Sequence, residues 1–477
     1  MLFNSLTFAI FLPIVFLLYW SIGKKRLNLQ NFFLIIVSYI FYGWWDWRFL
    51  TLIFLSSLVD YVVGGRMDRS NNPLHRKILL ATSLLVNLGI LGFFKYFNFF
   101  IESFIDFVGM FGLHGDPKTL RVILPVGISF YTFQTLSYTI DIYRKKIESS
   151  KNPIAFFAFV SFFPQLVAGP IERAASLLPQ FHKKREFNIE SAKDGLRQML
   201  WGFFKKIVVA DNMARSVEYV FSNHETLDGL TLFLGVFFFA IQIYCDFSGY
   251  SDIAIGTARL FGFNLMRNFA YPYFSRDIAE FWRRWHISLS SWFRDYVYIP
   301  MGGSFVGKGR RIFNIVVTFT VSGFWHGANF TFIMWGLING LYYIPLMLIN
   351  KQKKNTDIVA QGKLMPNLGE MGAMFITFMM ALLAWVFFRA ANVGDAFVYI
   401  GRIFSSPYMA LDYSRFVEPV LIAMIPLVVE WFAREKQHGM QIENFQLPLR
   451  WTLYACAIAG IAVLGSFGSQ EFIYFQF

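Results

Sequence analysis

Residues 312–349 form an uncharged run, IFNIVVTFTVSGFWHGANFTFIMWGLINGLYYIPLMLI. A membrane-spanning helix needs about 20 apolar residues, so this run is too long for a single crossing. Gly323 and Gly327 lie inside it on either side of His326, and they predict a turn between two arms. The first arm, 312–325, would rise only about 21 Å at about 1.5 Å per residue, less than the ~30 Å hydrocarbon core. The pattern predicts that His326 lies within the depth of a membrane.

The composition extends this interpretation to the whole chain. Of 477 residues, 56% are hydrophobic and 15% are charged, and there are 59 Phe, 22 Tyr and 13 Trp. Ordinary soluble domains have roughly 25% charged residues, and a soluble protein could not bury so much apolar surface. Disordered, collagen-like and small disulfide-stapled classes are excluded. We predict an all-α, polytopic integral membrane protein with about 11–13 transmembrane or re-entrant helices.

The charge pattern favours a membrane over a nucleic-acid partner. The 43 Lys and Arg residues exceed the 30 Asp and Glu by 13, and they cluster in short runs between apolar segments. Such runs are typical of cytoplasmic loops that face anionic lipid. No RNP, zinc-finger or basic-zipper pattern is present, so no nucleic-acid partner is expected. One loop, 144–151, fits this rule only if segment 99–113 or 122–140 is re-entrant.

The N-terminal apolar segment, residues 6–22, is followed by the basic residues Lys24, Lys25 and Arg26. A signal peptide has its positive charge first and a cleavage site after the apolar region. The observed order predicts a retained first helix whose N-terminus lies outside the cell.

Three apolar segments contain Gly or Pro, at 163–170, 245–249 and 323–327. Non-helical backbone at membrane depth is tolerated only where protein or a water-filled cavity satisfies it. These predicted breaks therefore indicate an internal cavity. The two cysteines, Cys245 and Cys456, form no CxxC pair, so we expect neither a disulfide framework nor a metal site.

Two of the seven histidines stand out. An ionisable side chain at membrane depth suggests a functional site, so His326 is a candidate catalytic residue. The alternative, a neutral histidine that joins helices by hydrogen bonds, is equally open from position alone. The five histidines other than His286 and His326 lie in polar surroundings and are expected to be solvated loop residues: His75, His114, His182, His224 and His438.

His286 lies in residues 280–295, EFWRRWHISLSSWFRD. Wound as one helix, this segment places its aromatic residues and His286 on one face and its arginines on the other. Such a pattern is typical of an amphipathic helix at the membrane interface. His286 is then either a functional residue or an interfacial histidine bonded to backbone or lipid.

Other polar residues give weaker signals. Gln242 and Asp246 share a helical face, while Asp252 falls on another face, so no paired-carboxylate site is indicated. Residues 302–311 lack the P-loop pattern. The G-x-S-x-G and H-E-x-x-H motifs of serine hydrolases and zinc proteases are absent.

Several of these segments together resemble one family, the membrane-bound O-acyltransferases, and within it the branch of alginate O-acetylation proteins. The ending SQEFIYF at 469–475 is also similar. The six matching stretches occur in the family's order: FYGW at 41–44, LPVGISFYTFQ at 124–134, FPQLVAGPI at 163–171, YCDFSGYSD at 244–252, FWRRWHISL at 281–289 and FWHG at 324–327.

The resemblance implies that His326 is the catalytic histidine and His286 the second active-site residue. It also implies one membrane domain over residues 1–477, with a motif core at about 120–345 and helices around a central tunnel. No metal is expected. Seven further residues are expected to bind substrate or line the tunnel: Trp325, Asn329, Gln242, Asp246, Tyr250, Trp282 and Trp285.

The implied reaction moves an acetyl group from a cytoplasmic thioester, such as acetyl-CoA, to an exported polysaccharide such as alginate. Burial favours a neutral histidine, so His326 could accept the hydroxyl proton. His286 could position a substrate or donate a hydrogen bond to the oxyanion. Whether an acyl-histidine forms stays open.

The implied setting is a bacterial inner membrane, with membrane lipid, an extracytoplasmic acetyltransferase- or esterase-like partner and a cytoplasmic acyl carrier. No permanently bound cofactor is expected. Three alternatives remain: the same chemistry on peptidoglycan or another wall polymer, a transporter or channel with intramembrane histidines, and a non-catalytic scaffold.

Overall fold

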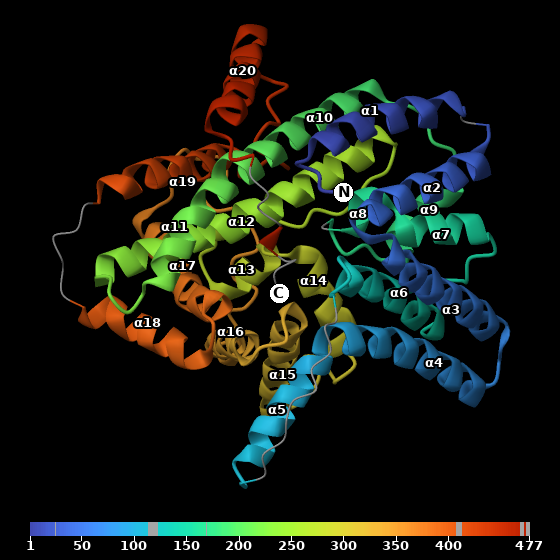
Figure 1. Cartoon of the computed structure of the whole chain (residues 1–477), viewed down its shortest axis with the longest axis horizontal. Coiled ribbons are helices and arrows are strands. Elements are labelled where there is room, and N and C mark those ends of the chain that lie inside the picture. The colour runs from blue at the N-terminus through green and yellow to red at the C-terminus, as the bar shows by residue number, and fades with distance from the viewer. Residues whose placement is uncertain (24, 113–122, 168, 407–412, 468–471, 474–477) are drawn as a thin grey trace. The chain divides into compact units, whose positions relative to one another are not determined.

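The computed structural model describes residues 1–23, 25–112, 123–167, 169–406, 413–467 and 472–473. Every regular element in these ranges is a helix, which confirms the all-α prediction (Figure 1). The chain forms two compact units, Met1–Lys193 with Thr257–Met266, and Asp194–Gly256 with Arg267–Phe477. His114 and most of the ending 469–475 lie outside the described residues. The single domain over 1–477, with its motif core at about 120–345, stays a prediction.

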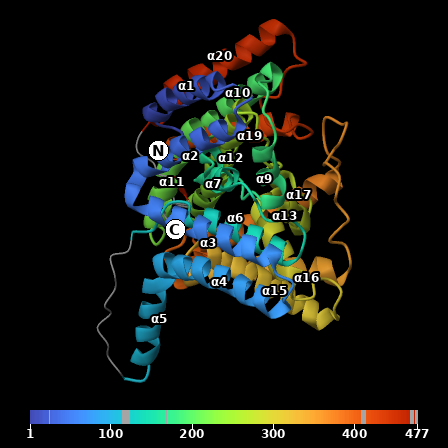
Figure 2. The same ribbon diagram turned by 90° about the vertical axis from the view of Figure 1, so that its right-hand side faces the viewer.

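The first unit is a set of helices joined by buried polar contacts. On α3, Asp60 accepts hydrogen bonds from Ser83 (2.5 Å) and Asn87 (2.9 Å) of α4, the kind of contact that holds membrane helices together. In both views α3, α4 and α6 lie close together and α5 extends away from them (Figures 1 and 2). The helices are α1 (Leu6–Ser21), α2 (Leu27–Asp46), η1 (Trp47–Phe49), α3 (Leu50–Arg69), α4 (Pro73–Leu91), η2 (Gly92–Tyr96), α5 (Phe97–Gly109), α6 (Ile128–Tyr143), α7 (Pro153–Ser161), α8 (Phe163–Leu166) and α9 (Ala174–His182).

The second unit contains both candidate histidines. Two of its helices, α10 and α12, begin or end in the first unit. Its helices are α10 (Ile189–Phe203), η3 (Phe204–Ala210), α11 (Asp211–Ser222), α12 (Gly229–Leu260), η4 (Pro272–Phe274), α13 (Ile278–Arg284), α14 (Ile287–Phe293), η5 (Arg294–Tyr298), α15 (Lys308–His326), α16 (Phe330–Leu348), α17 (Leu368–Arg389), α18 (Val393–Ser405), α19 (Ser414–Phe432) and α20 (Leu447–Leu464).

The predicted break at 245–249 is wrong, because α12 runs through it without interruption. Gly249 serves close helix packing instead. A Cβ atom on Gly249 would lie 2.8 Å from the carbonyl oxygen of Gly202, and one on Gly202 would lie 2.6 Å from that of Gly249. Small residues allow membrane helices to approach in this way.

The other two predicted breaks are present. Between α7 and α9 the described residues form only the short helix α8, and in the uncharged run α15 ends at His326 before α16 begins at Phe330. However, α15 begins at Lys308 and has 19 residues, so it rises about 28 Å rather than 21 Å. The predicted arm 312–325 is therefore too short, because the helix includes the basic residues before Ile312. The membrane depth of His326 stays a prediction.

Six helical runs in the described residues are long and apolar enough to cross a membrane, and the shorter α1 is also apolar. The protein is thus a multi-pass membrane protein. Several other helices are much shorter, with nine residues in α7 and seven each in α13 and α14. The total of 11–13 transmembrane or re-entrant helices stays a prediction, as does the side of the membrane on which each loop lies.

Candidate active site

His286 and His326 lie side by side in the second unit. Their ring centroids are 6.5 Å apart, and the residues are 1% and 3% exposed. Neither ring is thus in bulk solvent or on the outer surface of the unit. The structure brings together the two histidines that the sequence singled out.

His326 is the last residue of α15 and is enclosed by aromatic rings. The ring centroids of Trp325, Trp335 and Phe388 lie 5.0, 5.2 and 5.3 Å from that of His326. The C-terminal end of a helix carries partial negative charge, which favours a positive charge on a ring that has taken up a proton. This position suits a residue that accepts a proton during a reaction.

Two glycines hold α15 and α16 close enough to place His326 against Trp335. A Cβ atom on Gly323 would lie 2.1 Å from the backbone oxygen of Phe332, and one on Gly327 would lie 2.1 Å from the Phe332 ring. After the turn, the Asn329 side chain accepts a hydrogen bond from the backbone N–H of Thr331 and caps α16. Asn329 also donates to the Ala391 carbonyl, so its described bonds stabilise the turn. Its tunnel-lining role stays a prediction.

His286 occupies a different kind of position, between α13 and α14. Its backbone is left-handed, with φ 43° and ψ 56°, a conformation unusual for a residue other than glycine. Its Nδ1 lies 3.0 Å from Oδ1 of Asn268, and the Phe247 ring packs edge-on against it at 4.6 Å. The single amphipathic helix predicted over 280–295 is therefore wrong.

Arginines within and just before this segment explain the error. Arg284 and Arg276 both pair with the buried carboxylate of Glu280, and Arg276 also pairs with Asp357. Arg283 donates to the carbonyls of Gln352 and Asn355. These side chains fasten the loop after α16 to α13, rather than forming a lipid-facing polar stripe.

The predicted tryptophans belong to the aromatic packing that includes the two histidines. Trp325 touches both histidines, with its ring 6.2 Å from that of His286. Trp285 packs on Trp385 at 4.9 Å, and Trp282 packs at 5.6 Å on Trp335, which in turn packs on His326. These rings form an apolar shell, and their part in a tunnel stays a prediction.

Two of the three predicted residues of α12 make contacts with other segments of the chain. Asp246 forms an ion pair with Lys206 (2.8 Å) and accepts a hydrogen bond from the backbone N–H of Ile473 (2.7 Å). Tyr250 is buried against the Phe472 ring at 4.5 Å. Gln242 lies one turn before Asp246 on the same helix. Asp246 and Tyr250 thus join the chain's C-terminal segment to α12, and tunnel lining by all three residues stays a prediction.

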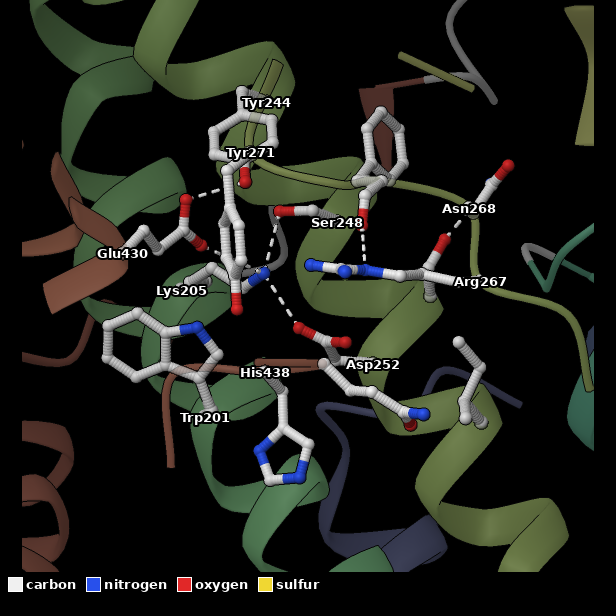
Figure 3. Close-up of a pocket in the computed structure, with 14 residues that line it drawn as sticks. Trp201, Lys205, Tyr244, Ser248, Asp252, Arg267, Asn268, Tyr271, Glu430 and His438 are labelled. Carbon is white, nitrogen blue, oxygen red and sulfur yellow. Dashed lines mark hydrogen bonds and ion pairs between the residues drawn. The ribbon is translucent and has the colours of Figure 1, made fainter. Parts of the chain in front are cut away.

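A buried charged cluster, which the sequence analysis missed, borders this region (Figure 3). Lys205 lies 2.7 Å from Asp252 and 3.6 Å from Glu430, and it donates to Ser248. The cluster lines a cavity of about 10 Å³, here called the ionic cavity, and Asn268 is part of its wall. The signal was present in the sequence, since adjacent lysines at 205 and 206 interrupt the apolar segment 198–221.

The remaining histidines divide by burial. His75 and His182 are exposed as predicted, and His224 is partly buried. His438 is only 1% exposed and lies 3.0 Å from Asp194, so the prediction that it is a solvated loop residue is wrong. Within the described residues, no three His, Cys, Asp or Glu side chains are grouped as metal ligands.

Comparison with known proteins places these features in a family. Residues 143–388 match the membrane-bound O-acyltransferase family. The chain is 40% identical to a probable alginate O-acetylase of Pseudomonas putida, with 100% of both chains covered. It is 32% identical to the peptidoglycan O-acetyltransferase of Helicobacter pylori, with 100% of this chain and 98% of the relative covered.

A more distant relative shares the central part of the chain. The teichoic acid D-alanyltransferase of Streptococcus thermophilus is 27% identical over 61% of this chain and 75% of its own length. The matched family region contains both His286 and His326. The chain therefore belongs to the membrane-bound O-acyltransferase family and is an O-acyltransferase with a helical, multi-pass fold.

Proposed function

We propose that the protein is a membrane O-acetyltransferase that serves the acetylation of an exported polysaccharide, with alginate as the first candidate acceptor. The observation that carries this proposal is the 40% identity to an alginate O-acetylase over the full length of both chains. Full coverage matters because it includes the segments that hold both histidines. The match to the membrane-bound O-acyltransferase family favours this function over a transporter or a non-catalytic scaffold.

The buried histidine pair suits acyl transfer from a thioester to a hydroxyl. In the proposed step, His326 accepts the hydroxyl proton while the hydroxyl oxygen attacks the thioester carbonyl carbon. The tetrahedral intermediate collapses, the carbon–sulfur bond breaks, and the proton passes to the leaving thiolate. The helix end beside His326 favours the transient positive charge on its ring.

The aromatic shell supports the same reaction by excluding water. Trp325, Trp335 and Phe388 surround His326 at ring distances of 5.0–5.3 Å. Water at this position would compete with the acceptor hydroxyl and hydrolyse the thioester. Because the shell is apolar, it also strengthens the electrostatic interactions within it.

The rest of the proposed setting follows the resemblance. We propose a bacterial inner-membrane location, acetyl-CoA or another acyl thioester as donor, and a cytoplasmic acyl carrier as an alternative source. An extracytoplasmic acetyltransferase- or esterase-like protein would complete the transfer to the polymer. The basic runs between apolar segments would attract an anionic donor.

A second candidate is peptidoglycan O-acetylation. It is favoured by the similarity to the Helicobacter pylori enzyme, which also covers nearly all of both chains. The chemistry at the histidines would be the same, and only the acceptor hydroxyl would differ.

Complementation tests the proposal. The chain is expressed in an alginate-producing bacterium whose own membrane O-acetylase has been deleted, and the acetyl content of both alginate and peptidoglycan is measured. We expect the wild-type chain to restore alginate acetylation and His326→Ala to abolish it at equal protein abundance. His182→Ala, which changes an exposed histidine, serves as the control and should behave as wild type.

Acetylated peptidoglycan with unacetylated alginate would replace the first candidate with the second. Full alginate acetylation by His326→Ala would reject the proposed catalytic histidine. Failure of the wild-type chain to acetylate either polymer, at normal abundance, would reject both candidates.

A further inference from the structure

Asn268 lies in the loop between α12 and α13 and is fully buried. Its side chain touches three residues of the site. Oδ1 lies 3.0 Å from Nδ1 of His286 and 2.9 Å from Oγ of Ser288, and Nδ2 donates to Oγ of Ser251 at 3.2 Å. All of these contacts lie within the second unit.

We infer that Asn268 is a positioning residue that holds His286 with its proton on Nδ1 and thereby makes Nε2 the acceptor nitrogen of that ring. The inference rests on the proposed function for its catalytic meaning, since it assigns a role to the second histidine of the site. It does not depend on which polymer is acetylated.

The orientation of the Asn268 amide supports this assignment. The backbone N–H of Ser288, which can only donate, faces the same amide atom as His286 at 3.4 Å. That atom must therefore be the oxygen, because an amide N–H₂ group in its place would face a donor. An oxygen that accepts from Nδ1 requires a hydrogen on Nδ1, and a neutral ring then has none on Nε2.

The backbone and the neighbouring rings keep His286 in this geometry. The N–H of Ile287 donates to the backbone oxygen of Asn268 at 2.8 Å, so main chain and side chain hold the same two segments together. Phe247 contacts the imidazole edge-on at 4.6 Å, and Phe269 stacks at 6.3 Å. A ring flip that exchanged the two nitrogens would break the Asn268 contact and move the ring within this packing.

The consequence concerns which partner His286 can serve. Burial lowers the pKa of His286, which lies outside the six candidate spans, to about 3. The ring is therefore neutral at physiological pH, and its Nε2 can accept a hydrogen bond from a substrate hydroxyl. It cannot donate one to an oxyanion. Of the two roles left open by the sequence, positioning and oxyanion stabilisation, the geometry selects positioning.

The charged groups of the ionic cavity also favour a neutral amide at position 268. Asn268 and Ser251 form part of the wall of the ionic cavity, beside Lys205, Asp252 and Arg267 (Figure 3). A neutral amide at this position separates the charged cluster from the imidazole without adding a charge of its own. Replacement by a residue with no polar atoms would remove the acceptor for His286 and the donor for Ser251 together.

Solid-state ¹⁵N NMR of the full-length protein in lipid bilayers tests the inference without any turnover. Histidine is labelled with ¹⁵N, and the His286 signals are identified as those missing from His286→Asn. We expect a protonated Nδ1 and an unprotonated Nε2 near neutral pH. A protonated Nε2 would overturn the inference, whatever the protein acetylates.

Variants of Asn268 supply the second measurement. Asn268→Asp keeps an oxygen acceptor for His286, whereas Asn268→Leu has none. We expect the Leu variant to lose the single Nδ1-protonated form and the acetylation rate to fall about 10–100-fold, the range found for residues that orient metal-bound histidines. The Asp variant should keep the Nδ1 proton but recover only part of that rate, because its negative charge also favours protonation of Nε2.

Asn314→Leu is the matched control, because Asn314 is also fully buried and donates to the Met301 carbonyl rather than to a histidine. It should leave the His286 signals unchanged. An Asn268→Leu protein that folds and keeps the wild-type tautomer would overturn the inference. If Asn268→Leu does not fold, the wild-type and Asp spectra decide. Failure of the polymer assay with the predicted tautomer intact would instead reject the proposed function.

Discussion

The two histidines of the site are held in contrasting ways. His326 ends a 19-residue helix and is packed among the rings of Trp325, Trp335 and Phe388. His286 sits between two seven-residue helices, has a left-handed backbone and is fixed by Asn268. His326 lies at a helix end whose partial negative charge favours a protonated ring, whereas the described hydrogen bond of His286 assigns the proton on its Nδ1. The comparison suggests that the first changes its protonation during the reaction and the second does not.

The largest effect should separate these two roles. We expect His326→Ala to lower the acetylation rate by about 10³-fold or more and His286→Ala by about 10²-fold, because loss of a proton acceptor costs more than loss of a positioning contact. The double variant should be no slower than His326→Ala, since residues that act in one step are not additive. Transfer of labelled acetyl groups from acetyl-CoA to the acceptor in membrane vesicles measures the acetylation rate of all three variants.

His75→Ala, at an exposed position, should match wild type in this assay. Strictly additive losses in the double variant would mean that the two histidines act in separate steps. An equal loss from each single variant would remove the distinction between them.

Disturbing the close packing of α15 against α16, which positions His326, should have the next largest effect. Gly323→Ala places a Cβ atom 2.1 Å from the Phe332 carbonyl oxygen and forces α15 and α16 apart. We expect a loss of about 1–3 kcal/mol in the free energy of unfolding, as for other overpacked contacts. Thermal unfolding in detergent measures the change against Gly372→Ala in α17, where the added atom meets nothing within 4 Å. Equal midpoints for the two variants would show that the close approach is not needed.

The left-handed backbone of His286 predicts a smaller, residue-specific effect. Asn tolerates this conformation well and β-branched residues do not. With φ at 43°, His286→Val should unfold with about 1–2 kcal/mol less stability than His286→Asn. Both variants lack the imidazole, so the difference between their unfolding midpoints reports the backbone alone. A Val variant as stable as the Asn variant would indicate that this segment relaxes to an ordinary conformation.

The smallest effect should come from Ser288→Ala. This change removes one donor to Oδ1 of Asn268 and leaves the His286 contact in place. A single hydrogen bond contributes about 0.5–1.5 kcal/mol, so the acetylation rate should fall about 2–10-fold. A loss as deep as that of His286→Ala would mean that Ser288, rather than Asn268, fixes the imidazole.

The helix–turn–helix position of His326 could be predicted from the sequence because it depends on local patterns. An uncharged run, a glycine on each side of the histidine and the following Asn329 together indicate two helices and a turn. The structure confirms the turn, although α15 starts four residues earlier than the apolar run. Hydropathy underestimates a helix whose first turn is basic, since Lys308, Arg310 and Arg311 are helical without being apolar.

The surroundings of His286 could not be predicted from the sequence, because they depend on contacts between segments that are distant along the chain. Asn268 lies 18 residues before His286 in a loop with no periodicity. The helical pattern of 280–295 predicted a polar face towards lipid headgroups. Instead, Arg276 and Arg284 form ion pairs with Glu280, and Arg276 also pairs with Asp357. A glycine in an apolar segment can either interrupt a helix or allow two helices to pack closely, and the sequence does not distinguish these roles. Gly249 interrupts no helix and permits close packing with Gly202.

The hydrogen bond from Ile473 to Asp246 joins residues 227 positions apart. During synthesis, Asp246 and Tyr250 therefore leave the ribosome long before Phe472 and Ile473 arrive to cover them. Until then the Lys206 ion pair is the only one of these described partners that Asp246 can meet. The packing around Phe247, which contacts the His286 ring, is completed only after Phe472 has been synthesised. A chain that stopped directly after α20 would keep the helices α1–α20 but would lack the residues that cover Phe247, Tyr250 and Asp246.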